Sequence, residues 1–207
     1  GEKGVATTLE LQEDGAMHEF LYGKEETYDS RSPWYRWQTF LSLKALSGTV
    51  DEVLRTRYSA VPEQILTYEA ASDSFVSKEI KEVGTIEQIR VYERGKGGVA
   101  TKLLLVGSEG VFLVKNEYHV RAVLTDGETK AALQNDDSYA CGNLLPSAFF
   151  TIEVTQSGES VSGIKLTGGG FGHGVGMSQN GAKNLANLGY DATDILEFYY
   201  EGCQVKQ

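Results

Sequence analysis

Hydrophobic and polar residues alternate through the middle of the chain, in the pattern typical of β-strands. The apolar positions of 86–92 and 99–105 flank a glycine-rich turn at 95–98, and a second turn at 108–110 leads into 111–114. Short strands separated by turns of this kind predict an antiparallel meander.

Three other segments also resemble strands. Residues 149–155 and 161–167 bracket Ser157-Gly158-Glu159, which predicts a hairpin. A strand-like run opens at Ser32 and continues to about Leu43, and 116–124 is either a further strand or a short helix.

Helical spacing appears in three segments. Thr49-x-x-Glu52 has the capping-box pattern and begins a predicted helix at 50–58. Apolar positions at 182–188 predict a helix that ends near Gly189, and a second helix is expected after Thr193. The predicted fold class is therefore α+β: mostly antiparallel strands, with two or three short helices concentrated at the C-terminus.

The first 30 residues show little periodicity. We expect an irregular N-terminal segment over 1–30, made of loops with one or two strands, ahead of a single domain over 31–207. A length of 207 residues suits one domain or two small ones.

The net charge of the chain limits which classes of binding partner are expected. The chain has 19 Lys and Arg against 29 Asp and Glu, a net charge of −10. Such a chain has no bulk attraction for nucleic acid or anionic lipid, so neither is an expected partner. No apolar run approaches the roughly 18 residues that span a bilayer, and any targeting segment is expected to lie upstream or to have been removed.

The two cysteines give no metal site. Cys141 and Cys203 form no CxxC pair and have no histidine at ligand spacing. A single disulfide and two free thiols both remain open, and no metal or cofactor is expected.

The richest segment is a glycine loop. Seven glycines fall between 168 and 181, together with His173, Ser178 and Gln179. The segment is neither a P-loop, a G-x-G-x-x-G fingerprint nor a G-x-S-x-G elbow. Either it is a tight turn against the core, with Ser178 capping the next helix, or it is the floor of a binding groove. In the second case a ligand would reach the backbone at Gly172 and Gly174, with hydrogen bonds from the polar side chains.

This loop also carries a resemblance to a known family. Gly170–Ala182, followed by Ile195-Leu196-x-x-Tyr199-Tyr200-x-Gly202, resembles the C-terminal signature of the SpoIID/LytB family of stage II sporulation protein D and amidase enhancers. Three upstream segments resemble the family in the same order: Ser32-Pro33-x-Tyr35-x-Trp37, Glu117-Tyr118-x-Val120-Arg121 and Leu145-Pro146-Ser147-x-x-Phe150. The resemblance covers roughly 30–205.

The resemblance implies a secreted or membrane-anchored cell-wall protein of Gram-positive, often spore-forming bacteria. The implied activity is lytic transglycosylase cleavage of peptidoglycan glycan strands, preferably strands without stem peptides, beside a cell-wall amidase. A glutamic acid would act as general acid/base. The expected location is therefore extracytoplasmic, and the expected ligand is the glycan strand.

The chain departs from the family at the catalytic segment. The family's glutamate lies upstream, in a Val-Pro-x-Glu-like stretch before an Ala-rich helix, and the chain offers only the superficial echo Val61-Pro62-Glu63. The family's Ser-Gly-Gly segment, near which some members hold zinc, is also missing. The catalytic residue is therefore unassigned, with Glu63, Glu197 and Glu201 as fallback candidates. The chain is either the glycan-binding portion of a transglycosylase or a non-catalytic wall-binding or amidase-enhancing module.

The predicted substrate-binding residues are His173, Ser178, Gln179, Gly172, Gly174 and Tyr200. Tyr199 and Tyr200 lie on opposite sides of a helix, so one is expected to pack inward and the other to present its ring. Trp34 and Trp37 either pack in the core, which is favoured, or stack on sugars. His18 and His119 are expected to be surface or hydrogen-bonded residues.

Overall fold

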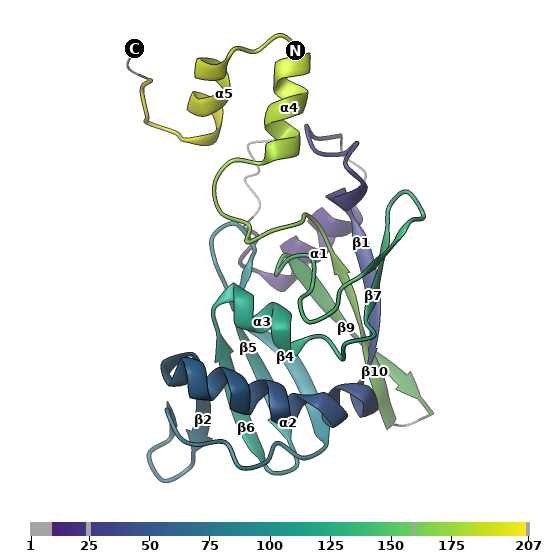
Figure 1. The fold of residues 1–207 in the computed structure, drawn as a ribbon, viewed down its shortest axis with the longest axis vertical. Coiled ribbons are helices and arrows are strands. Elements are labelled where there is room, and N and C mark those ends of the chain that lie inside the picture. Colours follow the sequence, from purple (N-terminus) through teal and green to yellow (C-terminus); the bar gives the residue numbers. More distant parts are fainter. Residues whose placement is uncertain (1–9, 24–25, 159, 206–207) are drawn as a thin grey trace.

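The computed structural model describes residues 10–23, 26–158 and 160–205, and within them the chain forms two five-stranded sheets (Figure 1). Sheet A has the order β8-β7-β1-β10-β9, and sheet B has the order β3-β2-β6-β5-β4. Neighbouring strands are antiparallel throughout. The strands are β1 (Trp37–Ser42), β2 (Ile65–Glu69), β3 (Ser74–Val76), β4 (Ile86–Arg94), β5 (Ala100–Gly107), β6 (Gly110–Lys115), β7 (Lys130–Leu133), β8 (Ser138–Ala140), β9 (Phe150–Ser157) and β10 (Ser160–Gly168).

The described residues also form five α-helices and two 3₁₀ turns. Helix α2 contacts strands of both sheets and α3, whereas α4 and α5 project from one end of the molecule (Figure 1). The helices are α1 (Asp14–Tyr22), α2 (Leu43–Ala60), α3 (Glu117–Val123), α4 (Gln179–Asn187) and α5 (Ala192–Tyr199), and the 3₁₀ turns are Pro33–Tyr35 and Pro62–Gln64. The predicted α+β class, with antiparallel strands and C-terminal helices, is confirmed.

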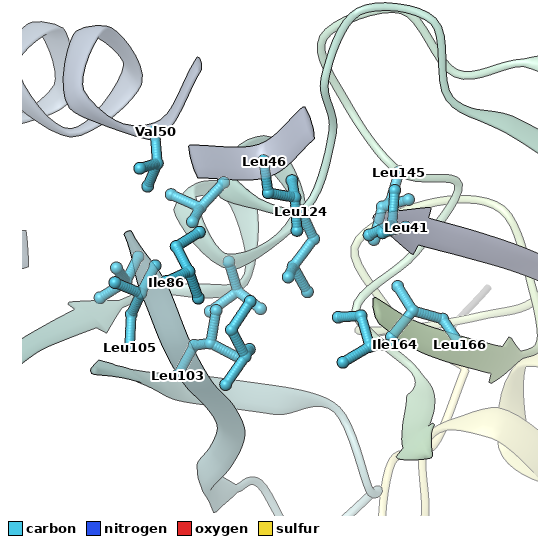
Figure 2. Close-up of a cluster of buried hydrophobic side chains, with 14 of the residues drawn as sticks. Leu41, Leu46, Val50, Ile86, Leu103, Leu105, Leu124, Leu145, Ile164 and Leu166 are labelled. Atoms are coloured by element: carbon cyan, nitrogen blue, oxygen red, sulfur yellow. The ribbon is translucent and has the colours of Figure 1, made fainter. Parts of the chain in front are cut away.

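One core joins the two sheets beneath α2. Leu46, Val50 and Leu54 recur every four residues along α2 and are all buried. They meet side chains of sheet B such as Leu103, while Ile164 lines the sheet A side of the same cluster (Figure 2). Each fully buried aliphatic side chain contributes about 1.5–3 kcal/mol, so this junction fixes the two sheets against each other.

Helix α1 corrects the prediction of an irregular segment of loops and strands over 1–30. Met17 and Leu21, one helical turn apart, are buried in a small cluster with Leu11. The short helix offers few buried positions, and its periodicity is therefore too weak to stand out in the sequence. Residues 1–9 lie outside the described part of the chain.

The second correction concerns the segment from 32 to 60. Pro33–Tyr35 forms a 3₁₀ turn whose N-cap is Ser32, so the strand begins only at Trp37. Helix α2 begins at Leu43 rather than near residue 50, because Leu43 and Leu46 extend the buried face backwards. Thr49 is not a cap: its hydroxyl donates to the Leu46 carbonyl within the helix, at 3.3 Å.

The remaining strand predictions agree with the structure. The meander is β4-β5-β6, and the hairpin is β9-β10. Residues 117–123 are helical, which resolves the alternative left open for this segment. Asn116 caps α3, because its side chain accepts a hydrogen bond from the Tyr118 N–H.

Candidate functional site

The glycine loop, residues 168–178, leaves β10 and leads into α4. The Gly170 N–H donates to the Trp34 carbonyl at 2.7 Å, and the Trp37 indole N–H donates to the Gly170 carbonyl at 3.2 Å. Trp37 itself is buried, as the favoured reading predicts. The start of the loop is thereby fixed to the segment that enters β1.

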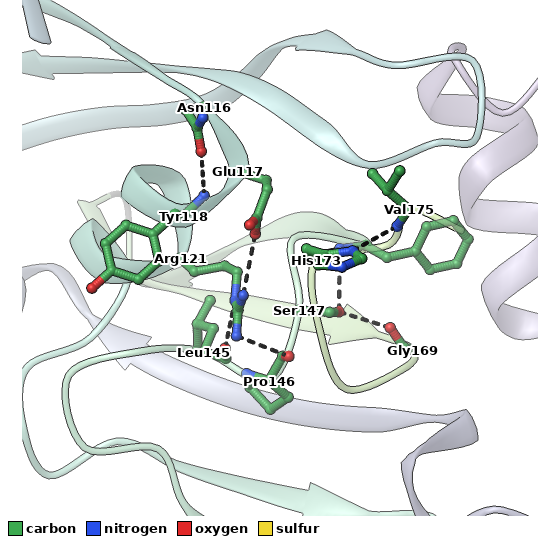
Figure 3. Close-up of polar contacts among 11 residues, drawn as sticks. Asn116, Glu117, Tyr118, Arg121, Leu145, Pro146, Ser147, Gly169, His173 and Val175 are labelled. Carbon is green, nitrogen blue, oxygen red and sulfur yellow. Dashed lines mark hydrogen bonds and ion pairs between the residues drawn. The ribbon is translucent and has the colours of Figure 1, made fainter. Parts of the chain in front are cut away.

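The 145–147 segment holds the next part of the loop (Figure 3). The Gly172 N–H donates to the Pro146 carbonyl at 2.9 Å, and the Ser147 hydroxyl donates to the Gly169 carbonyl at 2.7 Å. Ser147 is buried and its hydroxyl also accepts the Phe149 N–H, so it is fully used within the fold.

Arg121 of α3 positions the 145–147 segment in turn. Its guanidinium donates to the carbonyls of Leu145, at 2.8 Å, and Pro146, at 3.3 Å. Glu117, one turn earlier, lies 3.2 Å from the same guanidinium and balances its charge (Figure 3). Three segments that are distant in sequence therefore form one hydrogen-bonded network behind the glycine loop.

A turn of sheet B supports the loop from another side. Gly174 has φ +76°, and a Cβ there would lie 2.5 Å from Cγ2 of Val99. The Val99 turn is held by Arg94, whose guanidinium donates to the Gly98 carbonyl at 3.1 Å and pairs with Asp14 of α1. Burial lowers the pKa of Arg94, and the Asp14 carboxylate opposes that shift.

His173 is exposed at the tip of the loop. Its Nδ1 accepts a hydrogen bond from the Val175 N–H at 2.9 Å. An accepting Nδ1 places the proton of the neutral ring on Nε2. That Nε2–H has no acceptor within the described part of the chain. The prediction of a surface loop with an accessible His173 is confirmed, while the groove and the ligand contact stay predictions.

Ser178 serves as the N-cap of α4. Its hydroxyl donates to Oδ1 of Asp29 at 2.8 Å and accepts the Gly181 N–H at 3.1 Å. Tyr199 completes this cluster, because its hydroxyl lies 2.0 Å from the position that a Cβ on Gly181 would take. Burial raises the pKa of Tyr199, and the nearby Asp29 carboxylate raises it further.

The two adjacent tyrosines divide as expected. Tyr199 is half-buried between α5 and α4, whereas Tyr200 is exposed. The Tyr200 hydroxyl lies over the loop, 3.3 Å from where a Cβ on Gly176 would stand. Gln179 is exposed at the first turn of α4. The structure thus brings Tyr200 to the loop but uses Ser178 for the cap.

In the part of the chain that the structure describes, the three glutamates named as alternative catalytic residues make no hydrogen bond to the glycine loop. Glu63 sits in the 3₁₀ turn before β2, where its carbonyl accepts a hydrogen bond from Lys115 rather than from the loop. Glu197 and Glu201 are exposed on and just after α5. Within the described ranges, no group of three or more His, Cys, Asp or Glu side chains could hold a metal ion.

The other residues named from the sequence are two histidines and two cysteines. His18 stacks on Tyr22, but Nδ1 of His119 is buried without a hydrogen bond, which corrects the expectation for His119. Burial lowers the pKa of His119. Both cysteines are free thiols, Cys141 buried and Cys203 exposed. None of the described helices is long and apolar enough to cross a membrane.

Sequence reasoning missed the partners that hold the loop. Asp29, Val99 and Tyr139 carry no motif, and each meets the loop or its aromatic neighbours only through the fold. For Arg121, the signal in the sequence was its place in a segment that resembles the family. The structure shows that Arg121 holds the Leu145 and Pro146 carbonyls behind the loop.

Residues 63–176 match the family described as "Domain of unknown function (DUF8618)", which is more than half of the chain, and the chain belongs to that family. The match covers the meander, α3, the 145–147 segment and the first part of the glycine loop.

Named relatives are similar over shorter segments. The chain is 50% identical over 63 residues to stage II sporulation protein D of Bacillus subtilis, covering 30% of this chain and 17% of that protein. It is 48% identical over 59 residues to the amidase enhancer of the same species, covering 28% of this chain and 8% of that protein. An uncharacterized protein of Brachyspira hyodysenteriae is 45% identical over 62 residues, covering 30% of this chain and 16% of that protein.

These matches support the resemblance to the SpoIID/LytB family that the loop signature predicts. The matched segments span less than a fifth of the length of these relatives.

Proposed function

We propose that the chain binds peptidoglycan glycan strands outside the cytoplasm, as the glycan-binding portion of a SpoIID-like lytic transglycosylase. The observation that carries the proposal is the exposed loop in which the Nε2–H of His173 has no acceptor within the described chain. The similarity to a stage II sporulation protein D supports the same function.

The loop suits a neutral, hydroxyl-rich ligand. The backbone N–H groups of His173, Gly174 and Gly176 have no acceptor among the described residues. Glycan strands present hydroxyl and acetamide oxygens, which accept hydrogen bonds from such donors. Tyr200 adds a hydroxyl beside Gly176.

Binding without efficient cleavage is the expected behaviour of this chain alone. Protonation of a glycosidic oxygen requires a carboxylic acid next to it, and general acid–base catalysis contributes about 10²–10⁴-fold. Within the described chain, none of Glu63, Glu197 and Glu201 has a hydrogen bond to the loop.

The test is co-sedimentation with purified glycan, comparing denuded strands with strands that keep their stem peptides. We expect preferential binding to denuded strands, and His173→Ala should weaken it roughly twofold to tenfold, the value of one hydrogen bond. The melting temperature should be nearly unchanged, since exposed substitutions stay within about ±0.5 kcal/mol. His18→Ala, at an exposed histidine on α1, is the matched control.

Two results would contradict this proposal. Unchanged glycan binding with a clear drop in melting temperature would make His173 a structural residue of the turn. Strong release of 1,6-anhydro sugars would show that the chain cleaves glycan and direct mutagenesis to Glu63, Glu197 and Glu201.

A second candidate function is docking to a cell-wall amidase. The specific observation is that α5 and the turn between α4 and α5 expose large apolar side chains, including Leu188, Tyr190 and Phe198. One relative is also named an amidase enhancer. This candidate would be favoured if the chain stimulated a cell-wall amidase on a glycan substrate to which the chain itself does not bind. Loss of that stimulation in Leu188→Asp, at a residue 66% exposed, would locate the contact.

A further inference from the structure

Three aromatic rings from distant segments meet beside the glycine loop. Trp34 precedes β1, Tyr139 belongs to β8, and Phe171 lies in the loop itself. The ring centroids of Trp34 and Phe171 are 4.3 Å apart, and Tyr139 packs edge-on against both, at 4.8 Å from Trp34 and 5.6 Å from Phe171. We call this group the aromatic platform.

The platform is held rigid yet open to solvent. Phe171 is 55% exposed although it packs on Trp34. Its neighbours Gly170 and Gly172 both hold positive φ, and nothing lies within 4 Å of their Cβ positions. The hydrogen bond from Gly170 fixes the backbone of Trp34, and the hydrogen bond from Gly172 to Pro146 fixes the other side of Phe171, so the main chain is anchored at both rings of this tilted pair.

We propose that the aromatic platform is a sugar-stacking subsite, which takes the C–H face of one pyranose ring of the glycan strand next to His173. The inference rests on the proposed function and adds the residues that would select a sugar ring. A pyranose has a flat apolar face and an edge of hydroxyl groups, so it needs an aromatic surface with hydrogen-bond donors at its border. Phe171 supplies that surface and His173, two residues away, supplies the donor.

The chemistry of the platform argues for a neutral sugar rather than a peptide anchor. The three rings carry no formal charge, and the adjoining N–H groups of His173 and Gly174 have no acceptor within the described chain. A pyranose carries hydroxyl oxygens around the edge of the same ring that would lie on the platform, so one sugar can reach the rings and these donors together. Because the rings are already packed on one another, little side-chain entropy is lost on binding.

The tryptophans provide a direct readout. Trp34 is half-buried in the platform, whereas Trp37 is 1% exposed and acts as an internal reference. Titration with N-acetylglucosamine oligomers should change the fluorescence of Trp34 and protect it from a soluble quencher such as acrylamide. Phe171→Ala should weaken binding roughly tenfold, and Phe171→Tyr, which keeps the ring, should stay within about twofold.

The matched control is Phe40→Ala, since Phe40 is 57% exposed on β1 and belongs to no part of the platform. Melting curves of all variants identify any that fails to fold. If wild-type chain binds the oligomers and Phe171→Ala binds equally well, the platform is wrong while the proposed function stands. If the wild-type chain binds neither the oligomers nor denuded glycan strands, both the platform and the proposed function are wrong. Quencher protection of Trp34 by an unrelated peptide but not by the oligomers would make the platform a protein-docking surface.

Discussion

The two-sheet body and the C-terminal region after Gly170 are stabilised in different ways. The body buries one continuous cluster of large apolar side chains between α2 and the sheets. Beyond Gly170, Leu185 and Ile195 are the buried apolar residues of the described chain. The same region exposes a series of large ones: Phe171, Val175, Met177, Leu188, Tyr190, Leu196, Phe198, Tyr200 and Val205.

Polar contacts replace the missing core in the C-terminal region. Helix α4 is joined to the 28–32 segment by Asn180 and Asn184, and α5 has a capping box at Asp191. Helices of nine and eight residues are marginal by themselves. The comparison indicates that α4 and α5 open locally at a lower free energy than the body, and that the loop between the two regions takes its rigidity from the body.

The largest expected effect is at the buried link between body and loop. Arg121→Met leaves the Leu145 carbonyl without its side-chain donor and Glu117 without a counter-ion. The Pro146 carbonyl loses one of its two donors and keeps the Gly172 N–H. Loss of one partner of a buried pair costs about 3–5 kcal/mol, equivalent to roughly 6–20 °C in melting temperature for a chain of this size. Thermal unfolding followed by circular dichroism measures it.

The control for this change is Arg90→Met, because Arg90 is exposed on β4. Its melting temperature should stay close to that of the wild type. Equal melting temperatures for the two variants would mean that the loop does not depend on Arg121.

A smaller and local effect is expected within the C-terminal region. Gly181→Ala places a Cβ against the Tyr199 hydroxyl and near Asp29. Forced repacking of this kind costs about 1–3 kcal/mol. Hydrogen exchange should accelerate at amides of 179–199, while protection in β5 and α2 is unchanged.

Gly48→Ala is the matched glycine substitution in the body. Gly48 lies inside α2 with nothing within 4 Å of its Cβ position, so the change should stabilise α2 by roughly 0.5–1 kcal/mol. Slower exchange confined to the body in Gly48→Ala, against faster exchange confined to 179–199 in Gly181→Ala, would confirm that the two regions open separately. Loss of protection in β5 with Gly181→Ala would show one cooperative unit.

The two regions also differ in how far the sequence predicts them. The strands of sheet B follow from local alternation and from glycine turns, since each signal lies within a few residues of the strand it defines. Helix α1 was missed because its helical pattern rests on the single pair Met17 and Leu21. The glycine loop was identified by composition alone.

What the sequence could not supply is the set of partners around the loop. Arg121 lies about fifty residues from Gly172 in the chain, and Asp29 is 149 residues from Ser178. No local periodicity reports contacts over such separations, because only the packing of the two sheets creates them. Ser178 illustrates the consequence: its motif position favoured a ligand contact and a helix cap equally, and Asp29 places its hydroxyl in the cap.

An alkaline pH should loosen the C-terminal region before the body. An unfolded tyrosine ionises near pH 10, and burial raises the pKa of Tyr199 in the fold. The fold therefore favours the protonated hydroxyl. This stabilisation is complete below about pH 10 and is lost as the pH rises through the folded-state pKa.

The expected result is that opening of α4 and α5 increases by up to about tenfold per pH unit between the two pKa values. Tyr199→Phe has no ionisable hydroxyl and should lose most of that pH dependence. Near-UV circular dichroism between pH 9 and 12 measures it, with Tyr200→Phe, at an exposed neighbour, as the control. An identical alkaline transition in Tyr199→Phe would assign the effect to other tyrosines.

The last test uses the two native thiols as reporters of how each region opens. Cys203 is exposed after α5, whereas Cys141 is buried beside β8 and burial raises its pKa. Because the thiolate is the reactive form, Cys203 should react with a disulfide reagent at the rate of an exposed thiol, and Cys141 only when the body opens. We expect two well-separated phases of reaction. The slow phase should be faster in Arg121→Met and unchanged in Gly181→Ala, which would place the two thiols in regions of different stability. A single phase containing both thiols would contradict the division of the molecule into a buried body and an openable C-terminal region.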